Sequence, residues 1–422
     1  MNLRARYQEL RNHSLLRNSF FLMCSTIVLG GVGFLFWVVV ARSFSTDTVG
    51  LATTLISISS LIALFGLGGF DTVFMRFLAR AEDKSKVIST GLLVSALLSA
   101  ALAICFVFLV PVISPEIAFI QSNPLYVLLF VATTALTTWN TIINAAFIAH
   151  RKGSYVLLTN SVFSIAKLGL PFVFSSNDPM LIFSIVGAAQ LIYVSFGLGL
   201  MMRRLGYHPQ LRINFETVRR TYRYSAAAYS SNLLNLLPDS ILPILVLGSL
   251  GAHAAAYFYI AFTIANFLYA VAFMTTQATL AEAAHDTEHI GQHMRGGLKI
   301  IYGIMAPSIL LLVILAPFVL GIFGTDYRTE ASGLTVLFVL SGLLVALYAV
   351  LNTYFKATHQ LAALITTTGI KAIAILGLAV MFISGQGLIG VGWAWLIGNA
   401  LAVTAGGLYL LRPLRGTHKL GS

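Results

Sequence analysis

Apolar segments long enough to cross a bilayer recur along the whole chain, and this pattern restricts the folds that the chain can adopt. A membrane-spanning helix needs about 20 apolar residues, because the hydrocarbon core is about 30 Å thick. Within that core every backbone polar group must be satisfied by the chain itself, which a helix does. The sequence therefore predicts an all-α, polytopic membrane protein with about twelve spans. They are expected at residues 19–40, 50–70, 87–113, 125–149, 154–174, 180–202, 225–249, 255–280, 298–323, 331–355, 361–383 and 387–411.

The composition excludes several other classes. Only 9% of the 422 residues are charged, against about 25% in soluble proteins. Cys24 and Cys105 both lie in apolar segments, so no disulfide framework is expected. The net charge of +12 does not indicate a nucleic-acid partner, because no basic run is interleaved with aromatic residues. No phosphate-binding loop or nucleophile motif occurs, so we expect neither an enzyme nor a cofactor, and we expect transport energy to come from a gradient.

The positive charge lies almost entirely in loops on one side of the predicted spans. Arg42 and Arg328 lie on the other side, and Lys167 and Lys371 lie within spans. Cytoplasmic loops collect Lys and Arg, so both termini are predicted to be cytoplasmic, in the inner (plasma) membrane. The first apolar stretch is too long for a signal peptide and lacks a convincing cleavage site, so no cleavable signal is expected.

Two halves of six spans each resemble one another. Asn144 and Phe147 recur as Asn352 and Phe355 at an offset of 208 residues, and Lys167 and Lys371 are 204 residues apart. Six spans per unit preserve orientation, so the halves are predicted to be parallel repeats. The expected division is an N-terminal six-helix bundle at 1–202, an amphipathic cytoplasmic linker at 203–224 and a C-terminal six-helix bundle at 225–422.

The seventh span is predicted to be interrupted near its middle. Pro238 and Pro243 each remove a backbone donor, and Gly30 and Gly33 weaken the first span at the matching depth. Interrupted segments at corresponding positions of two repeats mark transport sites, so Gly30, Gly33 and Pro238 are predicted hinges. Beside this break stands Asp239, a costly residue at such depth. It either carries a coupling proton or sodium ion, with Asn235 as a carbonyl ligand, or forms a structural salt bridge.

Lys167 and Lys371 lie ten or more residues inside their spans, too deep to reach water easily. Cations in both halves favour a cavity that attracts a diphosphate, so both are predicted to bind substrate. The alternative is that each is paired and holds helices together. His285, His289 and His293 are spaced four apart in a loop, where solvated side chains are favoured over a metal site, so no metal is predicted.

Several short motifs resemble those of the polysaccharide (O-antigen, Wzx-type) flippases. That family belongs to the exporter superfamily, which also contains the multidrug and toxin extruders and the lipid II flippases. The seventh-span acid of the family is matched by Asp239, although the basic residue that usually follows it is Ser240 here. The other matching motifs are Ala41-Arg42 with Gly50, Gly66-Leu67-Gly68 with Arg76 and Ala79, Leu250-Gly251, and Ala316-Pro317 with Phe323-Gly324 and Tyr327.

The resemblance implies two six-helix bundles that form a V and open alternately to either side. It also implies transfer of a lipid-linked saccharide from the inner to the outer leaflet for cell-surface polysaccharide synthesis, alongside glycosyltransferases and a polymerase. An ion-coupled drug or metabolite antiporter of the same fold is the first alternative. A membrane polysaccharide polymerase or ligase is a second, which the short outer loops disfavour.

Overall fold

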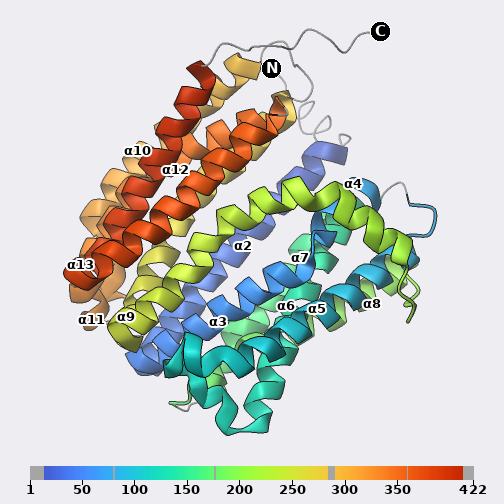
Figure 1. Cartoon of the computed structure of the whole chain (residues 1–422), viewed down its shortest axis with the longest axis horizontal. Helices are drawn as coiled ribbons and strands as arrows, with labels where there is room; N and C mark the ends of the chain where they lie inside the picture. Colours follow the sequence, from blue (N-terminus) through green and yellow to red (C-terminus); the bar gives the residue numbers. More distant parts are fainter. Residues whose placement is uncertain (1–13, 79–80, 175–176, 284–289, 359, 412–422) are drawn as a thin grey trace, which may run out of the picture. The chain divides into compact units, whose positions relative to one another are not determined.

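Long helices make up nearly all of the computed structural model (Figure 1), which describes every residue except 1–13, 79–80, 175–176, 284–289, 359 and 412–422. No strand occurs among these described residues. The first six-span half contains α2 (Ser14–Ser43), α3 (Thr46–Leu67), α4 (Phe70–Phe77), α5 (Lys84–Ile113), η2 (Pro115–Ser122), α6 (Pro124–Ala149), α7 (Gly153–Gly169), η3 (Leu170–Phe172) and α8 (Pro179–Leu205). The remainder contains α9 (Phe215–Ala283), α10 (Ile290–Gly321), α11 (Thr325–Glu330), α12 (Ser332–Ala357) and α13 (Leu361–Leu411).

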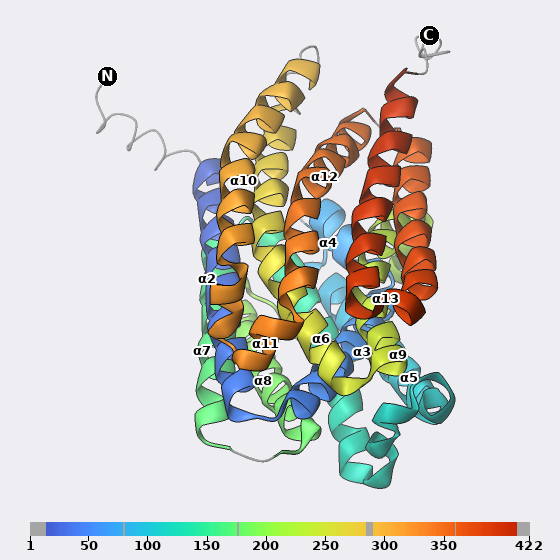
Figure 2. The same cartoon turned by 90° about the vertical axis from the view of Figure 1, so that its left-hand side faces the viewer.

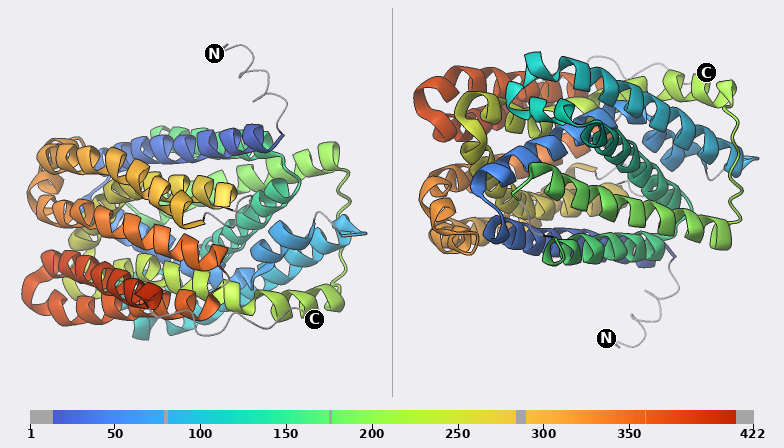
Figure 3. Two further views of the ribbon diagram at one scale, coloured as in Figure 1. Left: turned by 90° about the horizontal axis from the view of Figure 1, so that it is seen from above. Right: turned by 90° about the horizontal axis from the view of Figure 1, so that it is seen from below.

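Within the described part of the chain, ten helices are long and apolar enough to span a membrane, and two of them are long enough to do so twice. The apolar stretch of α13 has 51 residues and that of α9 has 48, or more than about 70 Å at 1.5 Å per residue. Each contains one glycine with non-helical dihedral angles, Gly251 (φ 85°) in α9 and Gly387 (φ 56°) in α13. The chain turns back at these glycines, so the two arms of α13 lie side by side (Figures 2 and 3). The predicted all-α fold with twelve spans is confirmed.

Polar residues fix where several spans begin. The Asn123 side chain accepts from the Leu125 amide, and the Asp178 side chain accepts from the Met180 amide. In both cases a proline follows as the first helical residue, where its missing N–H costs nothing. These caps satisfy backbone donors that would otherwise be orphaned at the helix start.

The predicted interruption of the seventh span is wrong. Helical backbone continues through Pro238 and Pro243 in α9, and the non-helical residue in this helix is Gly251. The first span is also continuous, because α2 runs through Gly30 and Gly33. Each proline still removes one backbone hydrogen bond, and the neighbouring turns hold the helix together across that loss.

Residue proximity divides the chain into two compact units that do not follow the chain order. The first unit is Met1–Leu233, Asp239–Ile260 and Gly321–Tyr327, and the second is Leu234–Pro238, Ala261–Leu320 and Arg328–Ser422. Buried aromatic side chains fill the core of the first unit, among them Phe70, Phe74, Phe147 and Tyr193. One core cluster of the second unit is aliphatic and includes Leu268, Ile301 and Val339, while Phe338 and Trp395 are also buried there and their rings are in contact. The predicted domain bounds at 202 and 225 stay a prediction.

The connection between α8 and α9 is fastened along the first turns of α5. Backbone amides of His208, Gln210 and Asn214 donate to the hydroxyls of Ser85, Ser89 and Thr90, at 3.1, 3.0 and 3.1 Å. The Tyr207 hydroxyl also lies 2.9 Å from the Ser89 hydroxyl, and burial raises the pKa of Tyr207. Figure 3 shows this connection as a thin line beside the start of α5. We call residues 206–214 the strap.

Candidate functional site

In the second unit, Lys371 on the first arm of α13 lies inside a cluster of polar and aromatic side chains. Only 6% of its surface is exposed. Its Nζ atom lies 3.5 Å from the Asn235 amide oxygen. The same atom lies 4.8 Å from the centre of the Tyr348 ring and 5.7 Å from that of Trp395. An ammonium above an aromatic face is attracted by the ring quadrupole, so amide and rings together stabilise a charge away from water.

Tyr348 on α12 is the centre of this cluster. Its hydroxyl accepts from the Asn352 amide at 3.1 Å, and it lies 3.1 Å from the Asn235 amide oxygen and 2.9 Å from the Thr368 hydroxyl. A phenol carries one proton, so Tyr348 donates to Asn235 or to Thr368 at any moment. Thr368 gives its own proton to the Leu364 carbonyl. The network therefore links α9, α12 and α13 within one unit.

The structure thus brings together two residues for which the sequence predicts different roles. Asn235 was predicted to hold a coupling ion and Lys371 to bind substrate, yet the Asn235 oxygen faces the Lys371 ammonium. A sodium ion at the same oxygen would be repelled by that ammonium. The contact therefore favours Asn235 as a residue that orients Lys371. Tyr348 was not predicted at all, although it stands four residues before Asn352 and so on the same face of its helix.

In the first unit, Lys167 on α7 lies among aromatic rings. Its Nζ atom is 4.3 Å from the centre of the Phe36 ring, 5.5 Å from that of Trp37 and 5.9 Å from that of Phe163. Phe36 and Trp37 are buried residues of α2. The Trp37 ring packs edge-on against Tyr259 at 4.7 Å, which fixes the face that Trp37 presents.

The two lysines occupy chemically different surroundings. The rings around Lys167 come from α2 and α7, whereas those around Lys371 come from α12 and α13. At the 204-residue offset the equivalent of Asn235 is Gly31, which has no side-chain amide. The predicted repeat therefore accounts for the two lysines but not for their partners.

The remaining predicted residues lie as follows. Asp239 is half-buried and Pro238 is buried, both within continuous helix. A Cβ atom added to Gly33 would meet no atom within 4 Å, so close packing is not what requires glycine there. His285 and His289 lie outside the described residues, and so does the His293 side chain. Among the described residues, no group of three His, Cys, Asp or Glu side chains is arranged to hold a metal ion.

One buried acid was missed by the sequence analysis. Asp71 on α4 is 9% exposed, and burial raises its pKa. It stands at the border of a predicted span, just after two glycines with left-handed backbone, Gly68 and Gly69. Those glycines end α3 and start the short helix α4, which turns Asp71 inward. The Gly-Leu-Gly stretch was the available signal.

A second set of contacts in the first unit joins the end of α2 and the start of α3 to the turn of α9 near Gly251 and to residues 321–327. The Arg42 Nε atom donates to the Ile322 carbonyl at 2.6 Å. The His253 ring nitrogen lies 2.6 Å from an Asp47 carboxylate oxygen, and both side chains are more than half exposed. These contacts connect segments that lie more than 200 residues apart in the chain.

Comparison with known proteins gives matches of two kinds. Residues 15–281 match a family described as polysaccharide biosynthesis protein. A solved structure of the lipid II flippase MurJ in an inward closed conformation is similar with a TM-score of 0.76 and 14% identity, covering 93% of this chain and 87% of that one. An inward-facing multidrug resistance MATE transporter is similar with a TM-score of 0.66 and 16% identity, covering 93% of this chain and 97% of that one. An outward-facing MATE transporter gives 0.64 and 17%, covering 94% of both chains. Among curated proteins, no sequence matches.

Proposed function

Because the chain belongs to the polysaccharide biosynthesis protein family, we propose that it flips a lipid-linked oligosaccharide across the membrane by alternating access. The expected cargo is a saccharide on a polyprenyl diphosphate, moved from the inner to the outer leaflet of the inner membrane, with both termini in the cytoplasm. Glycosyltransferases would supply this cargo and a polymerase would consume it. The exporter fold, which the chain shares with MurJ and the MATE transporters, supports a transport role.

One observation carries the proposal, namely the Lys371 ammonium held inside a membrane-spanning unit by Asn235, Tyr348 and Trp395. Ionisable residues within spans are costly and usually functional. A lipid diphosphate offers the anionic oxygens that an ammonium binds, and a charge-assisted hydrogen bond contributes about 1.5–3 kcal/mol. Lys167 would supply a second cation from the first unit. Asp239 remains the proposed carrier of a coupling proton or sodium ion, with Pro238, Gly30 and Gly33 as proposed hinges.

An ion-coupled drug antiporter is the second candidate, because the likeness to multidrug transporters covers 93% of the chain. The fold does not separate the two functions. Their cargoes differ in charge, however, since many drugs are organic cations and a lipid diphosphate is an anion. The ammonium of Lys371 would attract an anionic lipid diphosphate and repel a cationic drug.

The test is flipping in proteoliposomes that contain a fluorescent lipid-diphosphate oligosaccharide, read as the fraction that a membrane-impermeant quencher reaches. Wild-type protein should flip this lipid and leave a neutral glycolipid in place. Lys371→Gln should lower apparent affinity by about ten- to 150-fold. Lys356→Gln is the matched control, because Lys356 is an exposed lysine at the end of α12. Uptake of a cationic dye without flipping of the diphosphate would favour the antiporter and overturn the proposal.

A further inference from the structure

A pocket of about 410 Å³ lies at one end of three spans in the first unit. It forms where α5 begins at Lys84, where α6 ends just before His150, and where α8 ends at Leu205. The ends of membrane-spanning helices lie at the level of the lipid headgroups. The distribution of positive charge predicts that this end faces the cytoplasm. The pocket is separate from Lys167 and Lys371, which lie within spans.

The walls of this pocket are fixed by hydrogen bonds. Its floor includes Tyr207 of the strap, whose hydroxyl lies 2.9 Å from that of Ser89. On the opposite wall the His150 Nδ1 atom lies 2.8 Å from the Ala146 carbonyl. Since a carbonyl only accepts, Nδ1 carries a proton, and the Nε2 atom donates to an anionic ligand when the ring carries its second proton. Holding Tyr207 and His150 in place lowers the entropy that these two side chains lose when a ligand binds.

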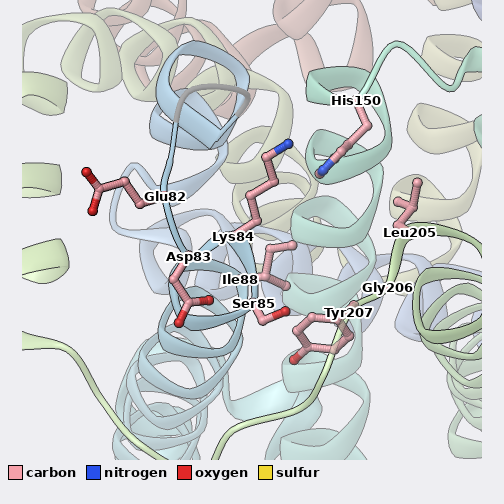
Figure 4. Close-up of a pocket in the computed structure, with 9 residues that line it drawn as sticks. All are labelled: Glu82, Asp83, Lys84, Ser85, Ile88, His150, Leu205, Gly206 and Tyr207. Atoms are coloured by element: carbon pink, nitrogen blue, oxygen red, sulfur yellow. The ribbon is translucent and has the colours of Figure 1, made fainter.

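Charges of both signs line the pocket, and they are separated within it. Figure 4 shows the side-chain nitrogens of Lys84 and His150 pointing toward one another on one side. The Asp83 carboxylate lies on another side, and Glu82 points away from both nitrogens. One Asp83 oxygen accepts from the Lys86 amide at 2.9 Å as the cap of α5. The second carboxylate oxygen is the one that can accept from a ligand.

We propose that this pocket binds the phosphoethanolamine headgroup of a membrane phospholipid, with the phosphate at Lys84 and His150 and the ammonium at Asp83. This headgroup carries both signs on neighbouring groups, as the pocket does. A headgroup with net negative charge, such as phosphoglycerol, has no cation to pair with the Asp83 carboxylate, so its phosphate is only repelled by that carboxylate. Phosphocholine has both signs, but its quaternary ammonium has no N–H to donate to a carboxylate. The proposal does not depend on the flippase function.

The test measures lipid binding to the delipidated full-length protein in detergent by native mass spectrometry. The probes are phosphatidylethanolamine, phosphatidylglycerol and phosphatidylcholine with identical acyl chains. Phosphatidylethanolamine should bind most tightly. Lys84→Gln and Asp83→Asn should each weaken it by about three- to tenfold, because each removes one charge at a partly solvated site. Asparagine is also a good helix cap, so the Asp83 variant keeps the start of α5.

Lys86→Gln is the matched control, because it removes an exposed charge from the same turn of α5 outside the pocket. It should leave binding unchanged, and a loss equal to that of Lys84→Gln would mean that general surface charge attracts lipid. Tighter binding of phosphatidylglycerol would show a simple anion site and overturn the proposal. Soluble glycerophosphoethanolamine separates the two sources of this headgroup. If it binds while the phospholipid does not, the ligand is a free metabolite and the lipid assignment is wrong.

Discussion

Gly50 on α3 and Ala252, just after the α9 turn, approach so closely that a Cβ atom on Gly50 would stand 1.8 Å from the Ala252 carbonyl oxygen. No real side chain tolerates that distance to backbone. The absence of a side chain at Gly50 therefore allows the two helices to touch. The Asp47–His253 and Arg42–Ile322 contacts join the same segments, so we interpret the whole set as one packed end of the first unit.

The first prediction is that Gly50→Ala prevents this approach. In an open helix position the same change stabilises by about 0.5–1 kcal/mol, but here overpacking against backbone should cost about 1–3 kcal/mol. The thermal unfolding midpoint of the purified protein should fall. Gly248→Ala is the control, because a Cβ atom there meets nothing within 4 Å. Equal midpoints for the two variants would contradict the close packing at Gly50.

The second prediction concerns movement at this packed end of the first unit. Cysteines placed at Asp47 and His253 should both react with a short bis-methanethiosulfonate, which links them through reducible disulfides, because the two native side chains are in contact at 2.6 Å. If alternating access requires these ends to separate, cross-linking should stop transport and a reducing agent should restore it. The background protein should first carry serine at Cys24 and Cys105. Full transport by the cross-linked protein would show that this end does not open.

The third prediction concerns the centre of the Lys371 cluster. Tyr348→Phe removes a hydroxyl that contacts Asn235, Asn352 and Thr368. Hydrogen bonds between membrane helices contribute about 0.6 kcal/mol each on average, so the loss should be about 1–2 kcal/mol of stability. Transport should fall as well, because Asn235 no longer has a fixed orientation toward Lys371. Tyr354→Phe on the same helix is the control, since its ring packs against Phe355. Equal effects of the two changes would remove Tyr348 from the site.

Lys167 provides a fourth prediction, which separates function from stability. Replacing a charge inside a membrane unit with an apolar side chain of similar shape is often neutral or stabilising. The cation–π contacts of a lysine contribute only about 0.5–2 kcal/mol against the cost of burying its charge. Lys167→Met should therefore leave the unfolding midpoint unchanged or higher while it lowers lipid flipping. A variant that unfolds earlier and still transports would make Lys167 a structural residue.

The fifth prediction is a pH dependence at Asp71, where burial raises the pKa of the carboxyl. The folded protein then favours the neutral form. The contribution of this carboxyl to the stability of the fold is fully present below its pKa in the unfolded chain. That contribution is lost as the pH rises through its pKa in the folded protein. Asp71→Asn should thus raise the unfolding midpoint at pH 7 and change it less at pH 4. The exposed Glu330 offers a control as Glu330→Gln. A lower midpoint for the Asn variant at pH 7 would show that Asp71 is needed as a carboxylate.

The number of spans was predictable because membrane helices are defined by length and apolarity, which are local properties of the sequence. Turns at Gly251 and Gly387 fall within a few residues of the predicted span ends. The effect of Pro238 was not predictable in the same way. A proline costs one hydrogen bond and a steric clash wherever it stands, but whether the helix breaks depends on packing that the sequence does not display.

The candidate site was only half predictable for a similar reason. The sequence itself shows Lys371, Asn235 and Lys167 as polar residues within apolar segments, so these three could be predicted without a structure. Tyr348 and Phe36 look like ordinary aromatic residues of a span, and only their placement around an ammonium gives them a role. The pairing of Asn235 with Lys371 joins residues 136 positions apart, and neither residue predicts the other.

The strap has a mechanical consequence for the whole chain. Three backbone amides between residues 208 and 214 are bound to α5, and α9 begins at Phe215. The linker between the two predicted repeats therefore has little slack. If the repeats move against one another, as the proposed transport cycle requires, the displacement has to be taken up within α9. Pro238 and Pro243 each remove a backbone hydrogen bond from that helix, so the proposed hinge would be a bend in a continuous helix and not a flexible loop.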